Sequence, residues 1–486
     1  MSTTEQAVAQ STGLERGTNW WGAFVIGLAG TILVTGIAPF AVQVLGAASI
    51  PMFAGVAAAG VLLSLCLAEL AAMMPDRTGG LPAYADETFR PLGSRVARHV
   101  GGISGWAYWL GWFPVAPINL ILAASYIAAL FSLPSLGTFT VPFLGTEVGT
   151  LTIIIALVGL GVMSIPSFLG IRLGATFATI LGIVSMVPLT LLVILPIFQP
   201  GKFNVSAVTS FALPAGTEAS LGLYAAWIFI MCWSVLAMEA AACYIGECRN
   251  PARDARIAMT ASGLYGFAIY VLTPIAFVGV LGGAKTFDPL TVYTQFTAAL
   301  FGEGSLVQWV VGIPLIVALM LSVLNAIMGC ARSLYQIAED GLVPRWFGRL
   351  NRNRVPGNAM AFNVTCSAIV LFFGSPLQIY VFSNMGYLLA CSLALVGYYI
   401  HRSRRPDLAR PVRLPGFVQY LALGVGLFGL VIWAVGGYLA ADYVVAADQR
   451  WLFLLGLAIL AAYLPLYWWR QVRDPLPKAQ DARATT

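Results

Sequence analysis

Long apolar runs follow one another along almost the whole chain, and each is separated from the next by a short polar segment or by glycine and proline. A helix needs about 20 predominantly apolar residues to cross the hydrocarbon core of a bilayer, and the runs have this length. We therefore predict about twelve membrane-spanning helices. They lie at residues 20–46, 50–74, 101–131, 149–169, 172–198, 221–246, 257–283, 305–337, 359–375, 377–401, 417–441 and 450–470.

Composition agrees with this pattern. Hydrophobic residues make up 59% of the 486 residues and charged residues only 9%, a balance that a water-soluble domain of this size does not have. The fold class is therefore all-α integral membrane. The least distinct boundary is the one between the ninth and tenth runs, at Gly374-Ser375-Pro376.

The basic residues predict the orientation, because Lys and Arg in short loops stay on the cytoplasmic side. With a cytoplasmic N-terminus, only Lys202, Lys285 and Arg450 of the 26 Lys and Arg residues fall in outer loops. We therefore expect both termini in the cytoplasm and the chain in the cytoplasmic membrane. The net charge of +6 then reflects topology and contact with an anionic inner leaflet, and not nucleic-acid binding.

Motifs for enzymatic chemistry are missing from the sequence. There is no glycine-rich phosphate loop with its lysine and no His-Glu-x-x-His, and the two histidines are His99 and His401. The seven cysteines have no metal-type spacing. We therefore predict no enzymatic activity, no cofactor, no metal site and no ATP-driven pumping. The polar first 18 residues do not have the pattern of a cleaved secretory signal.

Two of the predicted spans are interrupted. The first carries glycines between Gly27 and Gly36 and then Pro39, and the sixth passes from Trp233 to Glu239. Interrupted spans at corresponding positions of two halves point to an inverted-repeat transporter with its substrate site between them. If the first helix breaks near Thr35 and Gly36, their exposed amides can bind an anionic or polar group. The alternative is that these glycines serve close helix packing.

Four landmarks then carry a family resemblance. They are Gly79-Gly80-Leu81-Pro82-Ala83-Tyr84, the series Trp233, Glu239, Glu247, Asn250, Pro251 and Arg253, the stretch from Arg332 to Asp340-Gly341-Leu342-Val343-Pro344, and Arg404-Arg405-Pro406-Asp407-Leu408-Ala409-Arg410-Pro411. In this order and spacing the chain resembles the amino acid/polyamine/organocation (APC) transporter superfamily, from about Trp20 to Pro415.

The resemblance implies two inverted five-helix repeats, with broken helices 1 and 6, plus two additional helices. It divides the chain into a cytoplasmic tail (1–18), a core with helices 1–5 and 6–10 (19–401), a basic loop (402–416), helices 11–12 (417–470) and a second tail (471–486). The implied function is secondary transport of an amino acid by alternating access, with proton coupling or exchange. The alternatives are transport of a carboxylate-free amine or polyamine, and a ligand sensor without transport. A homodimer is compatible with the residues.

The resemblance also implies a substrate site between the first and sixth spans. Its residues are Ile32, Thr35, Gly36, Ile37, Trp233, Ser234, Ala237 and Asn325. An indole such as that of Trp233 can hold an ammonium group by cation–π attraction. Family members often carry Gly-Ser-Gly where this chain has Val34-Thr35-Gly36, and the stiff Val34 favours the amine alternative.

Three acidic residues are candidates for coupling or gating. Glu239 lies far from the ends of its span, where an ionisable group is expensive. It can bind a substrate amine, carry a proton that gates transport, or bond to free amides of the broken first helix. Glu69 and Glu247 lie near the cytoplasmic interface, where ion pairs with Arg332 or Arg77 would close an inner gate. Alternatively, they only hold helix ends to loops.

Overall fold

The computed structural model of the protein describes residues 17–77, 79–142, 144, 146–282, 287–445 and 447–474. Residues 1–16 and 475–486 lie outside the described residues, and they include most of the two predicted tails. Lys285 also lies outside them.

Helices dominate the described part of the chain. In chain order they are α2 (Trp20–Thr31), α3 (Val34–Leu45), η1 (Gly46–Ala48), α4 (Ser49–Met73), η2 (Leu81–Tyr84), α5 (Ala85–Phe89), η3 (Arg90–Leu92), α6 (Ser94–Trp112), α7 (Val115–Leu130), α8 (Thr150–Leu169), α9 (Ile171–Ile194), η4 (Leu195–Phe198), η5 (Pro200–Lys202), α10 (Val205–Thr209), α11 (Leu221–Val235) and η6 (Leu236–Glu247). There follow α12 (Pro251–Leu281), α13 (Val292–Phe301), α14 (Leu306–Glu339), η7 (Arg345–Gly348), α15 (Gly357–Val370), η8 (Leu371–Phe373), α16 (Pro376–Arg404), α17 (Val418–Tyr443), η9 (Ala447–Gln449), α18 (Trp451–Ala461) and α19 (Tyr463–Val472).

Nine helical segments in the described part of the chain are long and apolar enough to cross a membrane. The number is smaller than twelve partly because the segment Val34–Met73 runs through a bend at Gly46 without a polar loop and the apolar helix at Gly357–Phe373 is short. Helix α9, at Ile171–Ile194, covers most of the predicted fifth span. The predicted boundary at Gly374-Ser375-Pro376 is confirmed, because Gly374 has a φ of +79° and α16 begins at Pro376.

Interruptions occur inside three of the predicted spans. The first changes direction at Ile32 and Leu33, between α2 and α3. The third is divided at Phe113 and Pro114, between α6 and α7. The sixth continues from α11 into η6, which is a 3₁₀-helix over its whole length. Long 3₁₀ stretches are uncommon and often mark a functional hinge.

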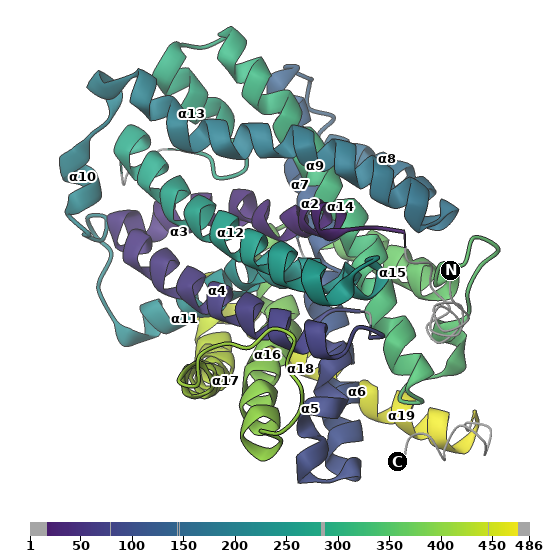
Figure 1. Cartoon of the computed structure of the whole chain (residues 1–486). Helices are drawn as coiled ribbons and strands as arrows, with labels where there is room; N and C mark the ends of the chain where they lie inside the picture. The colour runs from purple at the N-terminus through teal and green to yellow at the C-terminus, as the bar shows by residue number, and fades with distance from the viewer. Residues whose placement is uncertain are drawn as a thin grey trace.

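The interrupted helices lie together in the middle of the molecule. In Figure 1, α2, α3 and α4 cross the centre close to α12, and η6 packs against α2, α4 and α12. Helix α17 packs on α16 and α11 at the edge of this group, and α18 also packs on α16. The two helices that follow the core therefore cover one side of it.

Backbone contact between α2 and η6 depends on glycine. A Cβ atom at Gly30 would lie 1.7 Å from the carbonyl oxygen of Ala237, and one at Gly27 would lie 2.8 Å from Cβ of Ala241. Any side chain at Gly30 would therefore overlap the η6 backbone. The packing interpretation of these glycines is confirmed for this pair of elements.

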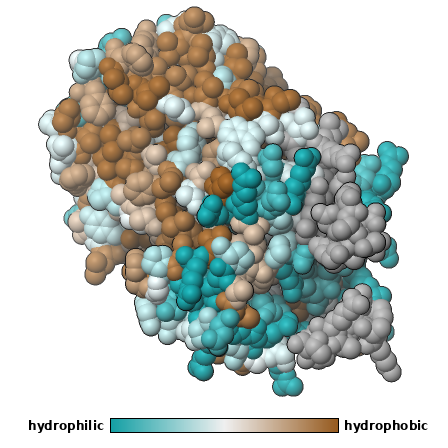
Figure 2. All heavy atoms as spheres, in the orientation of Figure 1, coloured by the Kyte–Doolittle hydropathy of each residue, from teal (hydrophilic) through white to brown (hydrophobic). Residues whose placement is uncertain are grey.

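Hydrophobic and hydrophilic residues occupy different parts of the surface. In the view of Figure 2, hydrophobic residues cover much of the top and upper left, where Figure 1 draws α13, and hydrophilic residues gather at the lower right. Large apolar side chains such as Ile165, which is 62% exposed, lie on the outer helices. A small antiparallel hairpin of β1 (Thr138–Thr140) and β2 (Glu147–Gly149), which was not predicted, joins α7 and α8.

Candidate functional site

The junctions of the two interrupted helices meet at one side chain. Tyr270 on α12 places its hydroxyl 2.9 Å from the carbonyl oxygen of Gly30 in α2 and 2.7 Å from that of Ser234 in α11. The Ser234 hydroxyl lies 2.9 Å from the same phenol oxygen. All three residues are buried. A phenol carries a single O–H donor, so it cannot donate a full hydrogen bond to both carbonyls at once.

The amides of Thr35 and Gly36 are not exposed, contrary to the prediction. The break lies one turn earlier, and α3 begins at Val34. The Thr35 amide donates to the Ile32 carbonyl over 3.0 Å, and the Gly36 amide donates to the Leu33 carbonyl over 3.1 Å. The Thr35 hydroxyl also donates to Ile32, over 2.7 Å. The chain turns through this junction with helical dihedral angles, so it keeps hydrogen bonds that a fully opened break would lose.

Trp233 is held between three helices. Its indole N–H donates to the Gly111 carbonyl in α6 over 3.0 Å, and its ring packs 4.7 Å from that of Tyr380 in α16. The Tyr380 hydroxyl lies only 2.3 Å from the position a Cβ atom would take at Gly36. Tyr380 thus lies beside both Gly36 and Trp233, two of the predicted site residues.

The remaining predicted site residues divide into two groups. Ile32, Ile37 and Ala237 are buried on the interrupted helices, with at most 1% of each exposed. Asn325 belongs elsewhere: its side-chain oxygen accepts a 2.6 Å hydrogen bond from Tyr244, which lies next to the ion pair described below. No hydrogen bond therefore joins Asn325 to Trp233 in the described part of the chain.

Glu239 is bound by phenols. Its Oε1 atom accepts hydrogen bonds from Tyr108 in α6 (3.0 Å) and Tyr387 in α16 (2.9 Å), and the residue is fully buried. Of the three alternatives for Glu239, a bond to free amides of the first helix is therefore not observed, since the Thr35 and Gly36 amides bond to carbonyls of their own segment. Within the described residues, Oε2 of Glu239 has no hydrogen-bond partner.

Three aromatic rings surround this carboxyl group. The ring centres of Tyr108, Trp112 and Tyr387 lie 6.0 to 6.1 Å from one another. We call these three residues the aromatic box. The Tyr108 hydroxyl also lies 3.1 Å from Sγ of Cys243. No arginine or lysine forms an ion pair with Glu239 in the described part of the chain.

Glu247 forms a buried ion pair with Arg332, one of its two predicted partners. The guanidinium Nε lies 2.5 Å from Oε1, and both side chains are at most 1% exposed. Arg332 also donates to the Met328 carbonyl over 2.9 Å and lies 5.2 Å from the ring centre of Tyr244. We call Glu247 and Arg332 the inner ion pair.

The first residues of the described chain lie on the same end of η6. The Thr18 amide donates to the Glu247 carbonyl (3.2 Å), and the Arg249 amide donates to the Thr18 carbonyl (3.0 Å). These two bonds join the start of α2 to the end of η6 beside the inner ion pair.

Glu69 pairs with neither Arg332 nor Arg77, contrary to the prediction. Its partners are Arg402 (3.0 Å) and Arg410 (2.9 Å), together with the Tyr398 hydroxyl and the Leu414 amide. These residues follow from α16 into the basic loop. Glu69 therefore holds this loop against α4, as the alternative interpretation expected.

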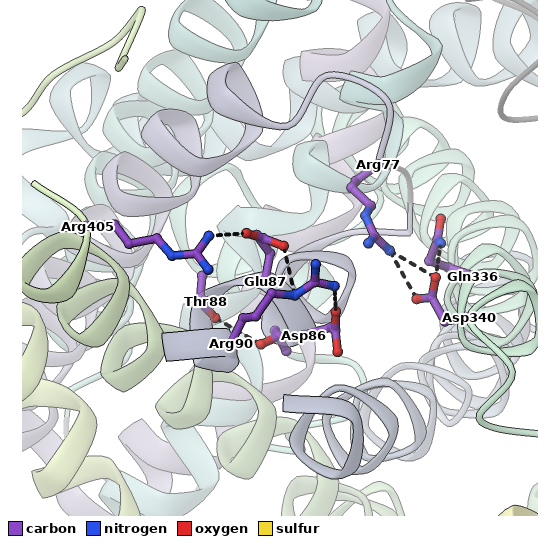
Figure 3. Close-up of polar contacts among 9 residues, drawn as sticks. Arg77, Asp86, Glu87, Thr88, Arg90, Gln336, Asp340 and Arg405 are labelled. Carbon is purple, nitrogen blue, oxygen red and sulfur yellow. Dashed lines mark hydrogen bonds and ion pairs between the residues drawn. The ribbon is translucent and has the colours of Figure 1, made fainter. Parts of the chain in front are cut away.

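Arg77 pairs instead with Asp340 at the end of α14, over 2.9 and 3.2 Å (Figure 3). Burial raises the pKa of the Asp340 carboxyl, and the Arg77 guanidinium opposes this rise. Figure 3 also shows a second chain of ion pairs, in which Glu87 lies between Arg405 (2.6 Å) and Arg90 (3.3 Å). Several elements are thus tied together at the end of the molecule that carries the inner ion pair.

Sequence reasoning missed the tyrosines that organise the site, namely Tyr270, Tyr380 and Tyr387. The available signal was their presence in apolar spans, since a buried phenol normally finds a hydrogen-bond partner. In the described residues, no group of three or more His, Cys, Asp and Glu side chains has an arrangement that could hold a metal ion.

A comparison with protein families decides the relationship. The chain matches the family model described as amino acid permease over residues 19–461. The chain belongs to the amino acid permease family. The resemblance to the APC superfamily that the four landmarks indicated is thereby confirmed.

Curated relatives of this permease are transporters by name. It is 25% identical to an uncharacterized transporter of Legionella pneumophila, over 83% of this chain and 86% of the relative. It is 26% identical to an arginine/ornithine antiporter of Pseudomonas aeruginosa, over 71% and 68% of the two chains. A polyamine transporter of Oryza sativa is 24% identical, over 76% of this permease and 64% of the relative.

Proposed function

We propose that this permease is a secondary transporter of an amino acid or a related amine in the cytoplasmic membrane. In this proposal it has twelve spans, of which the first ten form two inverted five-helix repeats, and both termini are cytoplasmic. Family membership and the names of the relatives support transport of this substrate class. The substrate site lies where the α2–α3 and α11–η6 junctions meet.

The convergence of Gly30, Ser234 and Tyr270 is the observation that carries the proposal. Two carbonyl oxygens from different interrupted helices face one hydroxyl donor. A substrate ammonium group has three N–H donors and can replace that hydroxyl at both carbonyls. Recognition of an amine is therefore the chemistry that this junction favours.

Burial on all sides supports alternating access. The residues at the junction are enclosed. The inner ion pair closes the end that the distribution of Lys and Arg among the loops, which we call the charge rule, predicts to be cytoplasmic. Release to that side requires Glu247 and Arg332 to separate. The paired arrangement of Glu247 and Arg332 is the closed state of an inner gate, and the separated arrangement is its open state.

Proton coupling through Glu239 is part of the proposal. A carboxylate without a cation in apolar surroundings is far less stable than the neutral acid. Within the part of the chain that the structure describes, Glu239 has phenols and no basic partner, whereas Glu69 and Glu247 have arginines. It is thus the carboxyl group best suited to load a proton in the closed state and release it when water enters.

A carboxylate-free organic amine is the second candidate substrate. The observation in its favour is that the Thr35 and Gly36 amides are already bonded to Ile32 and Leu33. A substrate carboxylate would have to displace these bonds, whereas an amine lacking a carboxylate would not.

Uptake into proteoliposomes tests the proposal. Labelled neutral, cationic and acidic amino acids are compared with simple amines, each with and without a proton gradient, and liposomes without protein are the control. Saturable amino-acid uptake that increases with acid outside is expected. Uptake of amines alone would select the second candidate, and binding without accumulation or exchange of any substrate would contradict transport.

A further inference from the structure

A polar cavity of about 660 Å³ lies away from the site described above, where the end of α14 and η7 meet α19. Arg345, Arg349 and Arg470 line it, together with the indoles of Trp346 and Trp469. Helix α19 lies beside α6 in Figure 1, at the hydrophilic end of the molecule seen in Figure 2. The cavity therefore combines guanidinium groups with large aromatic surfaces.

Positive charge exceeds negative charge around the cavity. Its two acidic residues are Glu339 and Asp474. Asp474 accepts a 2.7 Å hydrogen bond from the Arg345 amide and lies 3.4 Å from the Arg345 guanidinium and 3.3 Å from that of Arg470. Arg349 is exposed and forms no ion pair in the part of the chain that the structure describes. Three arginines thus share two carboxylates.

Arg470 is the most deeply buried of these three arginines. Its side chain is 2% exposed, and its Nη1 atom faces Asp474. Its Nε atom has no hydrogen-bond partner among the described residues. A buried charged donor left without an acceptor is costly, and the positive charge of Arg470 at the wall of the cavity favours an anion there.

The position of the cavity relates it to the bilayer. Helix α19 completes the candidate membrane span Trp451–Val472. Trp468 and Trp469 in its last turns are 57% and 52% exposed, and Trp346 across the cavity is 43% exposed. Exposed tryptophans at the end of a span mark the level of the lipid headgroups. The charge rule predicts that this is the cytoplasmic leaflet, which carries the anionic lipids.

We propose that this cavity binds the phosphate of an anionic phospholipid headgroup. Arg345 and Arg349 bind the phosphate from the open side, and the positive charge of the buried Arg470 attracts it electrostatically. The rings of Trp346 and Trp469 contact the glycerol backbone and the first methylene groups. The proposal does not depend on transport or on the nature of the substrate.

Lipid binding to the folded protein raises its melting temperature, because a ligand that binds only the folded state stabilises it. The full-length protein in detergent is titrated with a short-chain phosphatidylglycerol, with the matching phosphatidylcholine, and with inorganic phosphate. The pocket variant is Arg345→Gln with Arg349→Gln. The control is Arg253→Gln with Arg256→Gln, which removes two exposed charges at the start of α12.

Phosphatidylglycerol is expected to raise the melting temperature of the wild type and the control variant, whereas phosphatidylcholine has little effect. In the pocket variant the titration midpoint should rise about 30-fold, since a basic residue near an anionic surface changes affinity about 5-fold. Equal midpoints in the pocket and control variants would overturn the proposal, because the lipid would then respond to surface charge alone. A full effect of inorganic phosphate would also overturn it and assign the cavity to a free anion.

Discussion

Three buried glutamates lie in three different environments. Glu69 has two arginines and Glu247 has one, whereas Glu239 accepts hydrogen bonds from two phenols and forms no ion pair among the described residues. A buried carboxylate opposite a guanidinium is an ion pair whose separation requires water or a new partner. A buried carboxyl group held by phenols can instead gain or lose a proton without breaking an ion pair. This difference suits Glu239 for coupling and Glu247 for gating.

Glu239→Gln separates proton coupling from structure. The glutamine amide keeps an oxygen that accepts from Tyr108 and Tyr387 but cannot titrate. We expect the variant to fold and to exchange substrate, while its uptake no longer increases with acid outside. The measurement is uptake against external pH, with Glu303→Gln in the exposed loop between α13 and α14 as the matched control. Unchanged rate and pH dependence in Glu239→Gln would exclude Glu239 as the proton carrier.

The inner ion pair has a measurable energetic signature. Glu247→Gln leaves the Arg332 guanidinium buried without a counter-charge, which costs about 3–5 kcal/mol for buried pairs. Its melting temperature in detergent should therefore fall clearly. Glu87→Gln, which removes a partly exposed partner of Arg405, should cost about 0–1 kcal/mol.

The exchange of both charges tests the pairing itself. Glu247→Arg combined with Arg332→Glu should recover part of the stability and uptake that each single change removes. If the double variant performs no better than the single variants, the two residues do not act as a directly coupled gate.

At the level of elements, η6 and α2 behave as one packed unit. Their backbones touch at Gly30 and Ala237, and main-chain hydrogen bonds join Thr18 to the end of η6. An inner gate that opens at Glu247 therefore has to move both elements together or break this contact. The small residues along the interface make the first alternative the less costly one.

Gly30→Ala tests this packing. The new Cβ atom would lie 1.7 Å from the Ala237 carbonyl oxygen, and a backbone atom cannot move aside as a side chain can. We expect a loss of about 3 kcal/mol or more, at the upper end of overpacking effects, seen as a lower melting temperature and yield. Gly161→Ala on α8 has no heavy atom within 4 Å of the new Cβ and should be neutral or stabilising by up to about 1 kcal/mol. Equal behaviour of the two variants would contradict the packing argument.

Apolar run length was enough to predict the membrane helices closely. For example, the run at 149–169 corresponds to α8 at Thr150–Leu169, and that at 417–441 to α17 at Val418–Tyr443. The predicted boundary between residues 46 and 50 coincides with the bend at Gly46, although no polar loop separates the two helices there.

Partner choice was the part of the site that the sequence could not fix. Arg332, one of the two predicted partners of Glu247, is the partner observed. Glu69 instead pairs with Arg402 and Arg410, which lie more than 300 residues further along the chain. Tyr108 and Tyr387 meet at Glu239 from α6 and α16. Such contacts depend on helix rotation and depth, which a single apolar run does not define.

For the whole molecule, charge is concentrated at one end. The inner ion pair, the Glu69 network, the ion pairs of Figure 3 and the α14–α19 cavity all lie in the segments that the charge rule predicts to be cytoplasmic. Closure at this end therefore involves several ion pairs that are distant from one another in sequence.

The assignment of this charged end to the cytoplasmic side depends on the predicted orientation in the membrane. A cysteine introduced at Glu218, in the exposed loop before α11, should react with a membrane-impermeant maleimide added to intact cells. One at Arg352, in the exposed loop before α15, should react only after the cells are made permeable, because Lys and Arg loops stay inside. The unsubstituted protein gives the background, since six native cysteines are buried and Cys366 is partly buried. The reverse labelling pattern would place the inner ion pair and the phosphate cavity on the outer side, and would contradict both the proposed gate and the proposed lipid leaflet.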